Sequence, residues 1–97
     1  MARNQKLTRV IGGRTVQRAR AEPGKLVIRF SDESTMQVKK AGVADIFPPG
    51  GKIEAIQEDG VEFRLQFEEG PTVSLNLVDP SSSVAVRDKN NRVEYLG

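Results

Sequence analysis

The chain has 97 residues, of which 37% are hydrophobic and 29% are charged. This composition fits one globular domain that can fold without disulfides or a structural metal. The chain contains neither Cys nor His, which excludes thiol nucleophiles, imidazole and thiolate metal sites, and imidazole acid–base catalysis. Residues 1–40 hold ten Lys or Arg and three acids, whereas residues 41–97 hold five and ten. A basic half next to an acidic half indicates an anionic partner or an assembly of complementary halves.

The N-terminus is rich in basic and polar residues, MARNQKLTRV, and lacks the apolar core of about seven or more residues that a signal peptide has. No segment approaches the roughly 18 to 20 apolar residues that span a bilayer. We therefore expect a cytoplasmic protein with no membrane association. Residues 1–10 carry no strand or turn pattern, and we predict a flexible basic arm there, followed by one β domain over residues 11–97.

Shifting the chain on itself by 37 residues aligns Leu26 with Phe63, Ile28 with Leu65 and Phe30 with Phe67 without a gap. Glycine pairs precede both segments. This match predicts an internal repeat of residues 11–40 and 48–78. Two unrelated amphipathic hairpins can also match in this way, because a period-2 hydrophobic pattern is a loose constraint.

Each copy has the pattern of three strands. In residues 25–30 and 62–67 apolar side chains alternate with polar ones, and the same alternation recurs in residues 35–40 and 72–77. The first strand of each copy has inward residues three apart, Val16 with Ala19 and Ile53 with Ile56, which predicts a β-bulge in each. Turn residues such as Pro23 precede the second strand of each copy.

The segment between the copies ends in Ile46-Phe47-Pro48-Pro49. We expect Ile46 and Phe47 to cap the core, since most large apolar residues in a small domain are buried. If exposed, they would instead contact a partner. After the second copy, residues 84–95 are predicted to form a C-terminal hairpin. A lone hairpin is marginally stable, so it should pair with an edge of one copy, or be donated to a neighbouring chain.

Together these elements predict an all-β fold, a small sandwich or barrel built from two repeated three-stranded meanders, at about 14–40 and 52–78, plus the hairpin. The residues predicted to face the core follow from the alternation. They are Val16, Ala19, Leu26, Ile28, Phe30, Met36, Val38, Ile53, Ile56, Phe63, Leu65, Phe67, Val73, Leu75 and Leu77.

Catalytic chemistry has few candidate residues. Paired acids occur at Asp32-Glu33, Glu58-Asp59 and Glu68-Glu69, but they fall on predicted hairpin tips, where solvated carboxylates are common. The glycine pairs lack the Lys-Ser or Lys-Thr that follows a phosphate loop. We therefore expect no enzyme activity, no catalytic or metal site, no cofactor and no small-molecule substrate.

Two functions remain open. The first is a noncatalytic protein-interaction or assembly module, which docks on a protein partner or self-associates through sheet edges or charged faces. The second is binding to the phosphate backbone of nucleic acid, with the arm adding cations from Arg3 to Arg14. Few aromatics are left for base stacking. The candidate residues for partner or anion binding are the same in both cases: Arg18, Arg20, Arg29 and Lys39.

One criterion separates these functions. If the four residues share a face that no acids oppose, nucleic acid is favoured; if each lies beside a cross-strand carboxylate, the face is an ordinary solvated sheet. The sequence leaves open the partner, the oligomeric state, the strand order and the biological process.

Overall fold

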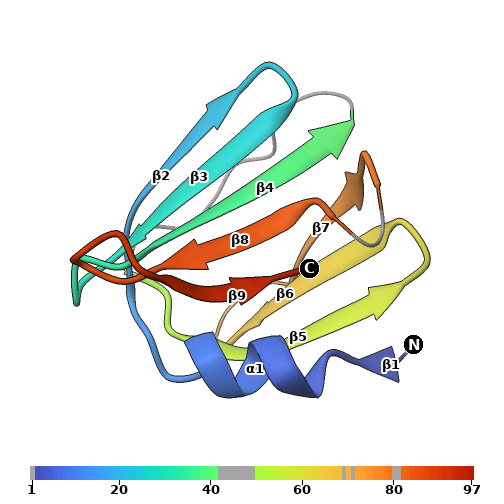
Figure 1. Cartoon of the computed structure of the whole chain (residues 1–97). Helices are drawn as coiled ribbons and strands as arrows, with labels where there is room; N and C mark the ends of the chain where they lie inside the picture. The colour runs from blue at the N-terminus through green and yellow to red at the C-terminus, as the bar shows by residue number, and fades with distance from the viewer. Residues whose placement is uncertain (1, 42–49, 69, 71, 80–81) are drawn as a thin grey trace.

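The computed structural model describes residues 2–41, 50–68, 70, 72–79 and 82–97. It is built almost entirely of antiparallel β-structure, with one short helix near the N-terminus (Figure 1). The elements in chain order are β1 (Ala2–Arg3), α1 (Gln5–Ile11), β2 (Val16–Glu22), β3 (Lys25–Phe30), β4 (Thr35–Ala41), β5 (Ile53–Asp59), β6 (Glu62–Phe67), β7 (Thr72–Leu77), β8 (Val84–Arg87) and β9 (Val93–Leu96). The all-β fold expected from the sequence is confirmed.

Strands β2–β3–β4 form one antiparallel meander and β5–β6–β7 form a second. The pairing registers of the two are offset by 37 residues: Leu26 pairs with Val38 in the first meander, and Phe63 pairs with Leu75 in the second. Each first strand has its register shift at the matching place, between residues 16 and 18 in β2 and between residues 53 and 55 in β5. These are the two β-bulges that the spacing of three predicted.

The two meanders meet at both ends through residues that are themselves 37 apart. Lys40 of β4 pairs with Leu77 of β7, and Thr15 forms an isolated bridge with Lys52. Around this bridge the Val16 N–H donates to the Gly51 carbonyl at 2.8 Å. Beyond the bridge β2 and β5 diverge, so the sheet is not closed along its length. Figure 1 shows the meanders as two splayed layers.

The C-terminal hairpin β8–β9 pairs with β4. Residues 35–38 of β4 pair with β8, from Thr35 with Arg87 to Val38 with Val84, whereas residues 40–41 pair with β7. Strand β4 therefore lies at a branch, because its two halves belong to different neighbours. The hairpin extends the first meander, in agreement with the expectation that a hairpin too small to be stable alone pairs with one of the two copies.

The N-terminal segment differs from the flexible arm predicted from the sequence. Ala2 and Arg3 pair with Glu58 and Gln57 of β5, and residues 5–11 form α1. The Asn4 side chain caps the helix by accepting from the Leu7 N–H at 3.0 Å. Leu7 and Ile11, four residues apart, lie on one face of the helix and are completely buried. The prediction of an arm was wrong because a helix this short is stabilised by tertiary packing rather than by a pattern that the sequence reveals.

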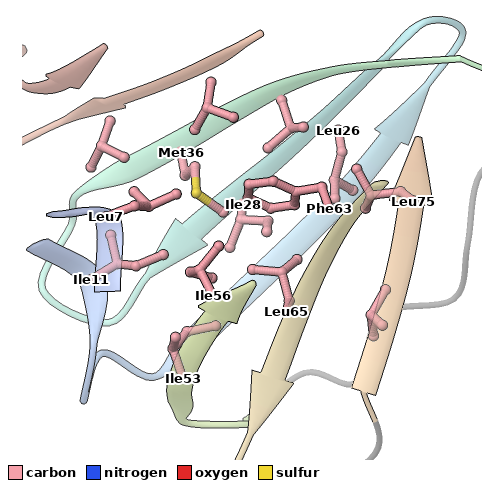
Figure 2. Close-up of a cluster of buried hydrophobic side chains, with 14 of the residues drawn as sticks. Leu7, Ile11, Leu26, Ile28, Met36, Ile53, Ile56, Phe63, Leu65 and Leu75 are labelled. Atoms are coloured by element: carbon pink, nitrogen blue, oxygen red, sulfur yellow. The ribbon is translucent and has the colours of Figure 1, made fainter. Parts of the chain in front are cut away.

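One apolar core lies between the two layers. All fifteen residues predicted to face it are buried except Ala19, which is partly buried against it. The core also holds residues that were not predicted, from α1 and from the hairpin: Leu7, Ile11, Val84, Val86 and Tyr95. Figure 2 shows Leu7 and Ile11 at one end of the cluster that contains Met36 and Ile56. Ile46 and Phe47, predicted to cap the core, lie outside the described residues.

Candidate interaction face

Strands β2, β3, β4 and β8 present one continuous outer surface. Their inward residues alternate with outward ones, as the burial of Leu26 and Ile28 on either side of Val27 shows. The register places the outward side chains in cross-strand rows, one of which runs from Arg18 through Arg29 and Thr35 to Arg87. We call this surface the basic face; its charged members are Arg18, Arg20, Glu22, Lys25, Arg29, Lys39 and Arg87.

Two pairs of like charges lie directly opposite each other on the basic face. Arg18 is the cross-strand partner of Arg29, and Lys25 is the cross-strand partner of Lys39. Side chains that face each other across antiparallel strands have Cβ atoms about 4.5–5.5 Å apart, and like charges in such positions destabilise the sheet. Each of the two pairs is therefore expected to lower the stability of the isolated sheet.

Carboxylates neutralise only part of this charge. Glu22 contacts Arg20 at 2.8 Å and Lys25 at 3.5 Å, and Glu33 of the β3–β4 turn contacts Arg29 at 3.7 Å. Glu22 is the cross-strand partner of Lys25, whereas it lies on the same strand as Arg20, and Glu33 lies in a turn. No described carboxylate forms an ion pair with Arg18 or Lys39. Of the four cations predicted from the sequence, Arg20 and Arg29 are therefore partly neutralised, whereas Arg18 and Lys39 have no described ion pair.

All four residues singled out from the sequence, Arg18, Arg20, Arg29 and Lys39, are exposed and lie on this one face. Sequence reasoning missed two further members. Lys25 could have been found, because it alternates outward with Arg29 on the same strand. Arg87 could not, since nothing in the sequence says that the C-terminal hairpin pairs with β4.

The N-terminal cations behave differently from the phosphate-tracking arm expected from the sequence. The Arg14 side chain is 18% exposed. Its guanidinium donates to both carboxylate oxygens of Glu94, at 2.9 and 3.0 Å, and to the Ser34 hydroxyl at 2.9 Å. It also lies 5.9 Å from the centre of the Phe30 ring. Arg14 thus joins β9 to the β3–β4 turn. Lys6 lies over the Tyr95 ring at 5.9 Å, away from the basic face.

The ion cluster around Arg14 shifts two pKa values. The hydrogen bond to Glu94 raises the pKa of Arg14, which partial burial opposes. For Asp32, partial burial alone would raise the pKa, but hydrogen bonds from the Ser34 hydroxyl and N–H, with the charge of Arg14, lower it below its ordinary value of 3.8. The acids in this part of the molecule are thus engaged in holding the fold.

A hollow of about 360 Å³ lies at one end of the basic face, where β4 leaves β8 for β7. Lys25, Gln37 and Lys39 line one side of it, and Ala85 and Leu96 line another. Leu96 is 64% exposed. The hollow therefore combines two ammonium groups with an apolar rim, which suits an anionic side chain that carries a hydrocarbon stem.

The described residues contain no group of three or more acids arranged to hold a metal ion. The rings of Phe30, Phe63, Phe67 and Tyr95 are all buried, so no described aromatic lies on the basic face for base stacking. Nor is any described helix long and apolar enough to cross a membrane. What the arrangement offers chemically is a positively charged sheet surface with a hollow at one end.

The chain was compared with protein families, curated proteins and solved structures. No protein-family model matches the chain, and no match was found among curated proteins or solved structures.

Proposed function

We propose that the protein is a noncatalytic interaction module that binds an acidic protein partner through the basic face. The observation that carries the proposal is the pair of like-charge contacts, Arg18 opposite Arg29 and Lys25 opposite Lys39. Such contacts reduce the stability of the free sheet, and carboxylates of a partner placed between them would be attracted by both members of each pair. The amphipathic hollow beside Lys39 supports a protein partner, since Glu side chains combine a carboxylate with a hydrocarbon stem.

We propose as well that the two meanders descend from one duplicated unit. The matched registers and bulges at 37-residue spacing support this. In that case the anion-binding role belongs to one copy alone, and the second copy is a natural internal control.

Nucleic-acid phosphate binding is the second candidate. The absence of any cross-strand acid opposite the four predicted cations favours it. A binder of this kind would contact the backbone without stacking, because the described aromatics are buried. Its affinity would fall steeply with salt, as released counterions require.

The test uses two double variants with the same net charge. Arg20→Gln with Arg29→Gln removes two cations from the basic face, whereas Gln57→Glu with Gln66→Glu adds two acids at positions 37 residues further on. Binding of the full chain to a fluorescent poly-glutamate peptide and to a 20-base-pair DNA duplex is measured by anisotropy from low to moderate salt.

We expect the peptide to bind, with affinity reduced about tenfold in the Arg variant and less than twofold in the Gln variant. Equal losses in the two variants would mean that net charge, not the basic face, drives binding. If only the duplex binds, and the Arg variant loses about two units of salt slope, the nucleic-acid function replaces the protein-binding one.

A further inference from the structure

One edge of the basic face is formed by strand β2, which among the described strands pairs only with β3. Strand β2 pairs with β3 along its whole length, but on its other side the described residues contact it only at Val16, where the chain meets Gly50 and Gly51. From residue 17 onward this side of β2 has no neighbouring described strand. An open edge of this kind offers backbone donors and acceptors to another extended chain.

The geometry of the β2–β3 hairpin identifies which backbone groups of β2 point away from β3. Glu22 and Lys25 flank the two-residue loop Pro23-Gly24, so they form a hydrogen-bonded pair, and the pairs alternate from there. Arg20 therefore bonds to Val27, whereas the N–H and C=O groups of Ala19 and Ala21 point away from β3. Each of these two residues can donate one hydrogen bond and accept one.

The corresponding edge in the second meander is occupied. Residue Ile56 of β5, which is 37 positions after Ala19, accepts from the Asn4 N–H at 2.8 Å and donates to the Thr8 hydroxyl at 3.0 Å. Strand β1 continues this cover, with Ala2 opposite Glu58. The same backbone geometry thus binds an extended segment in one meander, whereas in the other no described segment lies beside it beyond Val16.

We infer that the open edge of β2 binds an extended acidic segment of a protein partner by adding it as a further strand. The charges on this edge select the chemistry of the segment. Arg18 has no described ion pair, and the Arg20 side chain, although it contacts Glu22 at 2.8 Å, is 70% exposed. A second copy of β2 would bring Arg18 and Arg20 against their own counterparts, which like-charge repulsion disfavours. Carboxylates at alternate positions of an incoming strand would instead lie beside them, on the outer side of the sheet.

The other side of the incoming strand would face the core. Ala19 is small, partly buried and packed against the core, so apolar side chains at the remaining positions would extend the buried cluster. The recognised sequence therefore alternates acidic and β-branched residues, as a half-buried strand does. This inference rests on the proposed function, because it names the form in which an acidic partner is bound.

The experiment titrates the isotopically labelled full chain with a capped peptide of sequence Thr-Glu-Val-Glu-Val-Glu-Thr, followed by NMR amide exchange. One control peptide has Lys in place of Glu. A second keeps the three Glu residues but has Pro in place of both Val, which preserves the charge and removes N–H groups that strand pairing needs. The amides of Ala19 and Ala21 report on the edge, and that of Arg20, already bonded to β3, is the internal reference.

We expect the Glu peptide at saturation to slow exchange of the Ala19 and Ala21 amides at least tenfold, with little change at Arg20. The Pro and Lys peptides should bind at least tenfold more weakly and give no protection. The variant Ala19→Pro keeps the ladder to β3, because the Ala19 N–H does not point toward it, and should abolish protection of the remaining reporter, the Ala21 amide. If this variant fails to fold, the comparison of the Glu, Lys and Pro peptides on the natural chain tests strand addition by itself.

Three outcomes would overturn the inference. Equal binding of the Glu and Pro peptides without edge protection would leave the proposed function standing and remove strand addition. Protection of Ala19 and Ala21 in the absence of peptide, growing with protein concentration, would make a second copy the occupant. Binding of a DNA duplex but of no peptide would remove the proposed protein partner as well as this edge.

Discussion

The first meander, β2 to β4, and the second, β5 to β7, share their registers, their bulges and a common core, yet their outer surfaces differ. At positions 37 residues apart, Gln57 stands in place of Arg20 and Gln66 in place of Arg29. The cross-strand pair Lys25 with Lys39 corresponds to Glu62 with Asn76. The cationic pairs of the first meander thus have no equivalent in the second.

The comparison separates what the fold needs from what it leaves free. Inward positions are apolar in both meanders because both line the same core, whereas outward positions have no packing requirement and can differ. A residue type that recurs at both positions serves the shared fold, whereas an exposed cation that occurs in only one meander is not required by the packing that the two meanders share. This is why the basic face is the place to look for a partner.

The largest effect is expected in the core. Ile28→Ala and Leu65→Ala remove completely buried side chains at equivalent positions, and each should lower the free energy of unfolding by about 2–5 kcal/mol. Urea unfolding followed by circular dichroism measures both, and Val27→Ala, on the outer side of β3, is the control with a small effect. A loss below about 1 kcal/mol for only one of the pair would contradict a single core shared equally by the two meanders.

A smaller effect is expected where Arg14 in one meander corresponds to Gly51 in the other. A Cβ added at Gly51 would lie 2.8 Å from Cδ1 of the Phe67 ring, and this ring is almost completely buried. Gly51→Ala should therefore lower the free energy of unfolding by about 1–3 kcal/mol through overpacking. The Arg14 guanidinium, by contrast, lies over Phe30 without crowding it.

A double-mutant cycle tests this reason. Phe67→Leu makes room at the ring, so the loss from Gly51→Ala should be smaller in the Phe67→Leu background than in the natural chain. Strictly additive losses would show that the damage at Gly51 has another source than the Phe67 ring.

The ion cluster around Arg14 should make the free energy of unfolding depend on pH through Asp32, which belongs to the first meander. Because the folded pKa of Asp32 is lowered, its contribution to stability is fully present above its ordinary pKa and is lost as the pH falls through the lower folded value. Asp32→Asn should therefore reduce the loss of stability between about pH 5 and pH 2, with little change in the pH dependence near neutrality. Unfolding curves at several pH values measure it, and an unchanged acid slope would contradict the assignment.

Strands were predictable from the sequence where one side of the strand faces the core and the other faces solvent. Alternation located β3, β4, β6 and β7, and the spacing of three from Val16 to Ala19 and from Ile53 to Ile56 located β2 and β5 with their bulges. Helix α1 was not predicted, because only Leu7 and Ile11 mark its buried face and its docking against β5 depends on the completed fold. The candidate residues were identified from charge and period, but their cross-strand pairing depends on register, which no single strand specifies.

The smallest expected effect bears most directly on the basic face. Lys39→Gln removes one member of the Lys25 and Lys39 pair, and it should raise the free energy of unfolding by a few tenths of a kcal/mol, about 0.2–0.5, at low salt. The gain should shrink at 0.5 M salt because screening weakens the repulsion. The matched change Asn76→Lys, opposite Glu62, creates an attractive pair and should not destabilise. Thermal unfolding at both salt concentrations measures these differences. A loss of stability on Lys39→Gln would mean that this lysine serves the fold, whereas a gain accompanied by weaker binding of the acidic peptide would mean that it is retained at the expense of stability for a partner.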